Sequence, residues 1–349
     1  MIRQDTHIAA APLVEITRGS LVESLYRGYI AAVDAGGQII AQLGDIEAHT
    51  WYRSAAKPFQ AIPIITSGAA DHFALTPKEL AVITASHSGQ DVHLEVVSSI
   101  LNKIGLSETD LLCGAHAPYD ESAAGQLTAK KGQPRQLHNN CSGKHSGMLA
   151  FAKFIGQPIN DYINPQHPIQ QEILRVLAQF SGVSTSEIAI AVDGCSAPVF
   201  GVSVLAMARS YARLVGSRQT NLAPKLVVAA ERVVEAMLTF PEMIGGSRGR
   251  LDTDLMKTAQ GQIVSKVGAE GVQLLGIKPC QQYPNGLGIA IKIEDGDIRR
   301  ARDPVVIESL RQLGMLSNDQ VAELAAYSQK PVFNHRKLEV GKVRTCFKL

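Results

Sequence analysis

The apolar positions along the chain predict strands near both ends and helices between them. Residues 13–45 are predicted to form strands, and two apolar runs in this stretch flank Asp34-Ala35-Gly36-Gly37, which is typical of a β-hairpin turn. The C-terminal third holds further short apolar segments that predict strands, at 262–267, 272–277 and 287–293, with Asp295-Gly296 turning into 297–301 and a last strand within 332–347.

The middle of the chain carries the helical signals. Thr76-Pro77-Lys78-Glu79 is a capping box with proline at the first helical position, and residues 91–104 are amphipathic up to a stop at Gly105. A buried strand is predicted at 187–192, and residues 113–140 form a polar loop whose length suggests a function. The other helices are predicted at 54–70, where Pro63 should bend or end the helix, after Gly147 up to about 155, and at 166–181, 202–215, 223–239, 303–313 and 317–327.

This order of elements predicts an α+β protein. Its antiparallel sheet would be built from both chain ends, with a helical region inserted between the two sets of strands. We expect a single catalytic unit with a sheet subdomain at about 1–53 and 260–349 and a helical subdomain at about 54–259.

Composition and charge narrow the class of protein. The chain has 349 residues, of which 45% are hydrophobic and 19% charged, enough for a large core. The net charge of +2, without a strong basic run, implies neither nucleic acid nor a membrane surface as a partner. Residues 1–12 lack the pattern of a signal peptide, and no apolar run reaches the roughly 20 residues that span a bilayer. We therefore expect a cytoplasmic protein.

The cysteines point away from a disulfide framework. Their number is odd, their spacing is wide, and no secretion signal precedes them, which favours free thiols or metal ligands. They are Cys113, Cys141, Cys195, Cys280 and Cys346.

The first candidate for chemistry is the pair Ser54 and Lys57. Residues three apart on a helix share a face, with Cβ atoms roughly 5–6 Å apart. A serine needs a nearby base to act as a nucleophile, and a lysine becomes that base only if its pKa falls. Pro58 predicts a helix that begins near Ala55, which places Lys57 at the positive end of the helix dipole, and the charge of Arg53 would act in the same direction. The alternative is an N-capping serine beside a solvated lysine.

Two more clusters extend this pattern. Ser86-His87-Ser88 follows a helix, and Ser265-Lys266-Val267-Gly268 belongs to a short strand. A serine and lysine on a helix, a hydroxyl on a loop and a lysine-x-glycine strand occur in this order in penicillin-binding proteins and serine β-lactamases. The match is loose, because Val267 stands where a hydroxyl is usual and the middle motif lacks its asparagine. The alternative for Lys266 is an exposed lysine at a strand end.

A fourth cluster could bind a metal. Cys141-Ser142-Gly143-Lys144-His145 and, far along the chain, Asp193-Gly194-Cys195 offer two soft thiolates and nitrogen donors that suit zinc. Two buried structural cysteines are one alternative, and Cys141 as a nucleophile at a helix N-terminus is another. The arginines that could bind a carboxylate are Arg53, Arg248 and Arg250.

At these motifs the chain resembles the rhizobial-type L-asparaginase II family. The motifs follow the order of the family, and the block around Cys141 is the most specific of them. The stretches that carry the resemblance are Arg53–Gln60, Ala85–Ser88, His138–His145, Val192–Cys195 and Met243–Gly246, with Arg250, Asp252 and Thr253.

The resemblance implies hydrolysis of L-asparagine to L-aspartate and ammonia, a fold similar to serine β-lactamases and bacterial glutaminases, and a homodimer. It implies two serine–lysine tandems, with Ser54 as the nucleophile and Lys57 as its base, and with Ser86 and Lys266 relaying protons. It further implies a zinc site that tunes affinity rather than carrying the attack, at Cys141, Lys144 and Cys195. Substrate contacts would come from Asp193 to the ammonium and from Arg53, His87 and Arg250 to the carboxylate or the amide.

Other functions remain as alternatives. A glutaminase is the nearest, because one methylene separates the two substrates and is worth only about 1–3 kcal/mol of discrimination. A serine β-lactamase, peptidase or other serine amidohydrolase of this fold is the next. A non-catalytic module that binds an amino acid is the third, and it would bind asparagine without releasing ammonia.

Overall fold

The structure is a computed structural model and describes residues 10–349. Residues 1–9, on which much of the expected lack of a signal peptide rests, lie outside the described part. The strands are β1 (Ala11–Arg18), β2 (Leu21–Asp34), β3 (Ile39–Leu43), β4 (His49–Trp51), β5 (Ala189–Val192), β6 (Pro198–Ser203), β7 (Ile263–Gly268), β8 (Val272–Ile277), β9 (Leu287–Ile293), β10 (Lys330–Phe333) and β11 (Glu339–Thr345). The helices are α1 (Lys57–Thr66), α2 (Ala69–His72), α3 (Pro77–Ile83), α4 (Asp91–Lys103), α5 (Glu121–Ala129), α6 (Ser142–Phe154), α7 (Pro168–Ser181), α8 (Val204–Val215), α9 (Pro224–Thr239), α10 (Pro241–Ile244), α11 (Leu251–Thr258), α12 (Asp303–Gln312) and α13 (Asn318–Glu323).

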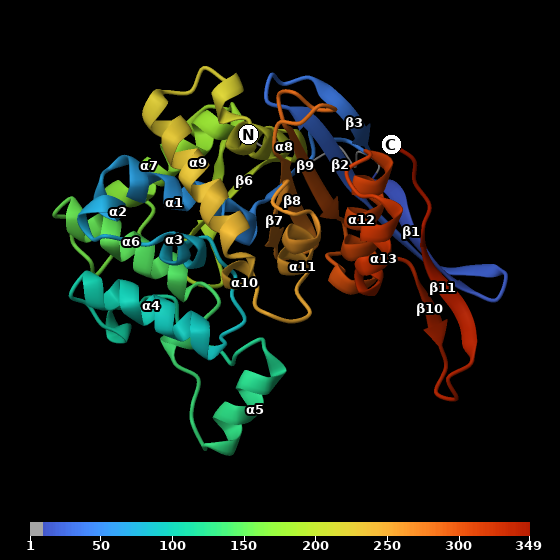
Figure 1. The fold of residues 1–349 in the computed structure, drawn as a ribbon, viewed down its shortest axis with the longest axis horizontal. Coiled ribbons are helices and arrows are strands. Elements are labelled where there is room, and N and C mark those ends of the chain that lie inside the picture. The colour runs from blue at the N-terminus through green and yellow to red at the C-terminus, as the bar shows by residue number, and fades with distance from the viewer. Residues whose placement is uncertain (1–9) are drawn as a thin grey trace.

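An eight-stranded antiparallel sheet organises the molecule. Its strand order is β10-β11-β1-β2-β9-β8-β7, with β3 paired to β2, so the N-terminal strands β1 and β2 lie between two groups of C-terminal strands. In Figure 1 this sheet occupies one side of the molecule, and helices α1, α3, α6, α7 and α9 gather on the other. The predicted α+β fold with a sheet built from both chain ends is therefore confirmed, and β7, which carries Lys266, is a terminal strand of that sheet.

The central strands of the large sheet, β8 and β9 among them, are buried on both faces. Helix α8 packs on one face, against β2, β8 and β9, while α12 packs against β1 and β11 within a second core cluster that also contains residues of α11. Ile289 and Ile291 belong to the second cluster, whereas Ala290 between them belongs to the first, as alternation along a strand requires. Gly288 lets α8 approach closely, because a Cβ there would lie 2.0 Å from the carbonyl oxygen of Ala208.

A second, three-stranded sheet corrects one prediction. Its order is β4-β6-β5, so β5 is an edge strand. The segment predicted as a buried strand at 187–192 is half exposed, because Ile190 is 41% and Val192 is 72% exposed. The buried strand is β6, which was not predicted and overlaps the start of the helix predicted at 202–215. An apolar run alone does not distinguish a central strand from an edge strand.

The predicted irregular loop at 113–140 contains helix α5. Asp120 caps this helix by accepting a hydrogen bond from the N–H of Ala123, and no residue of α5 is buried. A helix without a buried face leaves no apolar periodicity in the sequence, which is why the pattern did not reveal it. The long polar loop is thus partly helical.

Smaller details also differ from the predictions. Pro63, which was expected to bend or end its helix, does not end it, because α1 continues through Pro63 to Thr66. Residues 298–302 form a π-helical turn rather than a strand. Helix α11 was not predicted, and the segment 317–327 divides into α13 and a short 3₁₀ turn.

No helix in the part of the chain that the structure describes is long and apolar enough to cross a membrane. The subdomain boundaries, the homodimer and the cytoplasmic location stay predictions.

Candidate active site

The Ser54–Lys57 segment forms the entry to α1. Arg53 adopts a left-handed backbone conformation, with φ of 49°, and a 3₁₀ turn over Arg53–Ala56 leads into the helix. Ser54 makes no capping hydrogen bond, and Lys57 is only 1% exposed. The alternative of a capping serine with a solvated lysine is therefore wrong. Backbone strain of this kind costs free energy and is found most often at functional sites, where the surrounding structure holds it in place. Arg53 directly precedes the candidate nucleophile Ser54.

Both candidate lysines converge on one hydroxyl. The Nζ of Lys57 donates to the Oγ of Ser86 at 3.0 Å, and the Nζ of Lys266 donates to the same atom at 2.9 Å. Lys57 also contacts the carbonyl oxygens of Ala85 and Asn140. Within residues 10–349 no hydrogen bond joins Ser54 to the Nζ of Lys57. The geometry is thus a single serine between two amines, whereas the sequence suggested two separate tandems.

Burial sets the charge of these two lysines. It lowers the pKa of Lys57, and it lowers that of Lys266 well below the usual range although the carboxylate of Asp252 opposes the shift. Two ammonium groups against one oxygen would repel each other in a buried site. One amine can therefore be neutral and accept the Ser86 proton while the other stays charged. The predicted fall in the Lys57 pKa has burial as its leading cause, and Arg53 instead pairs with Asp193 at 2.8 Å.

A cavity of about 810 Å³ opens beside this cluster, a size typical of sites for small molecules. Ser54 and Ser86 both line it, and so do Gly268 at the end of β7 and Ala269 directly after it. In the described part of the chain the backbone N–H of Ala269 has no hydrogen-bond partner. On this wall the N–H donor can bind the oxygen of a carbonyl group, and a serine hydroxyl can attack its carbon. Sequence analysis missed Ala269, because a backbone donor leaves no mark in a sequence.

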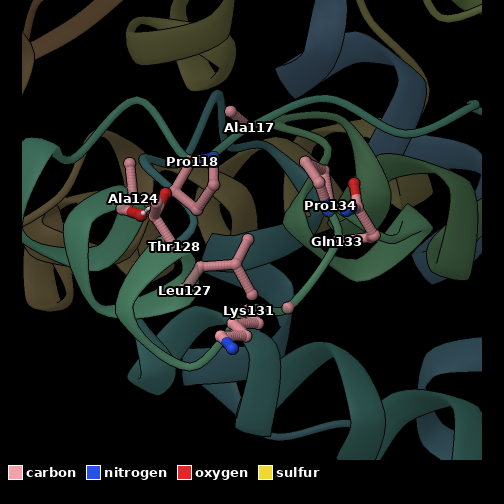
Figure 2. Close-up of a pocket in the computed structure, with 9 residues that line it drawn as sticks. Ala117, Pro118, Ala124, Leu127, Thr128, Lys131, Gln133 and Pro134 are labelled. Atoms are coloured by element: carbon pink, nitrogen blue, oxygen red, sulfur yellow. Dashed lines mark hydrogen bonds between the residues drawn. The ribbon is translucent and has the colours of Figure 1, made fainter.

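The loop that carries α5 forms another wall of the cavity through Tyr119 and Asp120. Figure 2 shows a separate hollow of about 350 Å³ inside the same loop, where Pro118, Leu127 and Pro134 face one another beside α5. None of the predicted site residues lines this hollow. The chemistry therefore belongs to the larger cavity.

Two of the predicted substrate-binding residues brace the loop around Ser86. Arg250 donates from Nη1 to the Oγ of Ser88 at 2.8 Å and from Nη2 to the carbonyl oxygen of Ser86 at 2.9 Å, and it lines the cavity. His87 is fully buried, does not line the cavity, and contacts the Oγ of Ser142 at 2.9 Å through Nε2. Its ring stacks on that of His93, with 5.0 Å between centroids. The geometry places His87 as a support for the loop.

Arg53 and Asp193, the other predicted substrate contacts, form an ion pair with each other. The Nε of Arg53 donates to the Oδ1 of Asp193 at 2.8 Å, and neither residue lines the 810 Å³ cavity. Their contact with a substrate stays a prediction. An adjacent guanidinium and carboxylate nevertheless have the charges that complement a zwitterionic amino acid.

The three predicted zinc ligands lie together. The Nζ of Lys144 donates to the Sγ of Cys195 at 2.9 Å, and a hydrogen bond from the Cys141 thiol, together with the ammonium of Lys144, holds the pKa of Cys195 well below its usual range. The same pairing, with burial, raises the pKa of Cys141, which disfavours Cys141 as a nucleophile. The structure therefore pairs the Lys144 amine with the Cys195 sulfur, buried next to the cluster of lysines, and the lowered pKa of Cys195 favours its thiolate form.

The donor set fits zinc by chemistry. Two thiols and an amine are soft or nitrogen ligands, and the Nε2 of His145 in this buried group has no hydrogen-bond partner among the described residues. Across residues 10–349 no group of three or more His, Cys, Asp or Glu side chains gathers, so a zinc ion here would have to use Lys144 in its neutral form.

The buried histidines predict a loss of stability in acid. Burial lowers the pKa of His87 and His93, so below about pH 6.5 the unfolded chain takes up protons that the native state does not. The free energy of unfolding should therefore decrease as the pH falls, by up to about 1.4 kcal/mol per pH unit for each such histidine. Urea unfolding at about pH 7 and about pH 5.5 measures this decrease.

The matched variants are His87→Gln and, for an exposed ring, His49→Gln. His87→Gln should lose less stability between the two pH values than the wild type, while His49→Gln should lose as much as the wild type. A His87→Gln protein whose stability falls as steeply as that of the wild type would show that His87 is not held neutral.

Comparison with known proteins places the chain in a family. Among curated proteins, none has a significant match to the sequence. Solved structures with partial similarity include Mglu in its native form, at 14% identity over 84% of this chain and 66% of that one, with a TM-score of 0.43. They also include a probable glutaminase from Bacillus subtilis complexed with 6-diazo-5-oxo-L-norleucine, at 13% identity over 82% and 84% of the two chains, with a TM-score of 0.39. This chain thus spans just under two thirds of the length of Mglu. The family model of L-asparaginase II matches residues 14–345, nearly the whole sequence, and the chain belongs to the L-asparaginase II family.

Proposed function

We propose that the protein hydrolyses the side-chain amide of L-asparagine, which yields L-aspartate and ammonia. The observation that carries the proposal is the hydroxyl of Ser86 held between the buried amines of Lys57 and Lys266, on the wall of a cavity that Ser54 also lines. Membership of the L-asparaginase II family supports an amidohydrolase. Serine and lysine suffice for amide hydrolysis when the lysine is dehydrated and partly neutral.

In the proposed mechanism Ser54 is the nucleophile. It is more exposed than Ser86 and lines the cavity, and among the described residues no amine donates to its hydroxyl. Its oxygen attacks the amide carbon, its proton passes to Lys57, and the C–N bond breaks as the nitrogen takes a proton and leaves as ammonia. Water then cleaves the serine ester to release aspartate.

Ser86 and Lys266 serve as a proton relay in this scheme. Ser86 can give its proton to the leaving nitrogen and take a replacement from one of the two amines, because both amines lie within 3.0 Å of its oxygen. The N–H of Ala269 would stabilise the oxyanion that forms during attack. The carboxylate and ammonium of the substrate would replace the contact between Arg53 and Asp193, and Arg250 would hold the loop of Ser86 in place.

We also propose a zinc ion held by Cys141, Lys144 and Cys195. When bound, zinc would supply a fixed positive charge that orients the substrate. The chain's own residues perform the proton transfers, since two serines and two lysines already provide a nucleophile and bases. Binding requires Lys144 to give up its proton and its pairing with Cys195.

A glutaminase is the second candidate. The cavity of about 810 Å³ is far larger than a single amino acid requires, so it accommodates the extra methylene of glutamine. A comparison of kcat/KM for ammonia release from the two amides decides between them.

The nucleophile assignment predicts the outcome of two substitutions. Ser54→Ala should lower ammonia release from L-asparagine by orders of magnitude, because removing the attacking atom abolishes the covalent path. Ser86→Ala should also be slow, because the relay is broken, but it should still react with the diazoketone analogue of L-asparagine. Mass spectrometry of the labelled protein should place the adduct on Ser54.

Three results would contradict this assignment or the function. An adduct on Ser86, or a Ser54→Ala protein that retains a tenth or more of the wild-type rate, would move the attack away from Ser54. A folded wild-type protein supplied with zinc that releases ammonia from neither amide would overturn the proposed function. Circular dichroism of each variant controls for folding.

The zinc proposal predicts a metal content. Protein purified without chelator or a metal-affinity tag should contain about one zinc ion per chain by elemental analysis, as expected of a dedicated site. Cys195→Ala should lose most of this zinc, whereas Cys280→Ala, which changes a cysteine outside the group, should keep it. Two results would contradict the proposed zinc site: a wild-type protein that contains no zinc after dialysis against the ion, or the same zinc content in both variants.

A further inference from the structure

Asp252 is a buried carboxylate that the proposed reaction does not use. It lies in the first turn of α11 and is 2% exposed. Its Oδ1 accepts hydrogen bonds from the Oγ of Ser265 and the Nε2 of Gln273, both at 2.8 Å, and its Oδ2 accepts one from the N–H of Val267 at 2.9 Å. Burying a carboxylate costs free energy unless hydrogen-bond donors compensate for the lost water. The three donors around Asp252 provide that compensation, which indicates a specific role for the carboxylate.

Asp252 forms hydrogen bonds with the two residues that flank Lys266 on β7. Ser265 and Val267 are the residues before and after Lys266 on β7, the terminal strand of the sheet. Val267 gives its N–H to Asp252, while its carbonyl oxygen accepts from the Nζ of Lys266 at 3.0 Å. The same Nζ reaches the Oγ of Ser86. The carboxylate therefore fixes the backbone that aims Lys266 at Ser86.

Asp252 also supplies the main opposing charge. Burial lowers the pKa of Lys266, the Asp252 carboxylate raises it, Lys57 and Arg250 lower it, and Cys141 raises it. Burial raises the pKa of Asp252, but Lys266 and then the hydrogen bonds from Gln273 and Val267 lower it below its usual range. No hydrogen bond joins the Asp252 carboxylate to the Lys266 amine in the described structure, so the carboxylate acts on the amine through space.

We propose that Asp252 is a positioning residue for the reaction at Ser86, because its carboxylate clamps β7 on both sides of Lys266 and balances the charge of that amine. This inference rests on the proposed amide hydrolysis. It assigns Asp252 a role in the proton transfers without any contact with the substrate.

The variant Asp252→Asn separates charge from shape. The Oε1 of Gln273 is buried without a partner among the described residues. If the amide of Gln273 rotates, that oxygen can accept from the new side-chain N–H while the new carbonyl oxygen keeps the contact with Val267. The variant therefore removes one negative charge and can preserve the hydrogen bonds. Ser265→Ala is the matched control, since it removes one donor to Asp252 and leaves the carboxylate charged.

Asp252→Asn should lower kcat for L-asparagine by about 10- to 100-fold and change KM little, the range seen when a supporting residue of a site is altered. The limb of the pH profile of kcat/KM that belongs to Lys266 should move to lower pH by about one unit, because loss of a nearby carboxylate makes the amine easier to deprotonate. The direction is the same whether Lys266 acts as a neutral base or as a charged donor. Ser265→Ala should leave both limbs in place.

Unmoved limbs in a folded Asp252→Asn protein would overturn the proposal, and so would the same displacement in Ser265→Ala. A second measurement separates this outcome from failure of the proposed function. In protein grown with ¹³C-lysine, the Cε resonance of Lys266, assigned with Lys266→Arg, should titrate at lower pH in Asp252→Asn than in the wild type. Equal midpoints would overturn the proposal even if another substrate were the true one, whereas a lack of ammonia release would overturn only the function.

Discussion

The constraint on which the site depends is the burial of three cationic side chains around one serine. Lys57, Lys266 and Arg250 come from α1, β7 and the segment before α11, and all three donate hydrogen bonds to Ser86, the lysines to its Oγ and the arginine to its carbonyl oxygen. Burying a cation without a partner is costly, so these elements can meet only if Ser86 is held in place and at least one lysine gives up its charge. Burial of the basic groups thus explains both why Ser86 is held in place and why one lysine can act as a base.

Two features of the fold satisfy this constraint: negatively charged groups near the lysines, and backbone segments that hold the loop of Ser86 and strand β7 in place. Asp252 places negative charge near Lys266, and Cys195, which is paired with Lys144, places negative charge near Lys57. In the part of the chain that the structure describes, neither group forms a hydrogen bond with the lysine whose charge it balances. His87 is kept neutral and stacked on His93, so it holds the loop and adds no further charge. Because β7 is a terminal strand, its outer edge is available to α11, and the backbone after Lys266 opens onto the cavity.

The sequence predicted more of the chemistry than of its geometry. The residue types at Ser54, Lys57, Ser86 and Lys266 and the strand–helix–strand order were sufficient for the fold class, because periodicity and motif spacing are local. The sharing of Ser86 by both lysines was not predictable, since it depends on how β7 packs beside the 3₁₀ turn that leads into α1, about 200 residues earlier in the chain. Helix α5 and the exposure of Val192 were missed because neither leaves a signal in local periodicity. Arg53 and Asp193 were each assigned to the substrate, and only the structure shows that they pair with each other.

A double-mutant cycle on Lys57 and Lys266 tests the central claim, that the two amines act through one shared hydroxyl. Lys57→Met, Lys266→Met and the double variant would be compared with the wild type by kcat/KM for ammonia release from L-asparagine. The account predicts strong non-additivity: the double variant should be little slower than the slower single variant, because either substitution already breaks the relay through Ser86. Losses of transition-state stabilisation that add in the double variant would show that the lysines act independently, and would contradict the account.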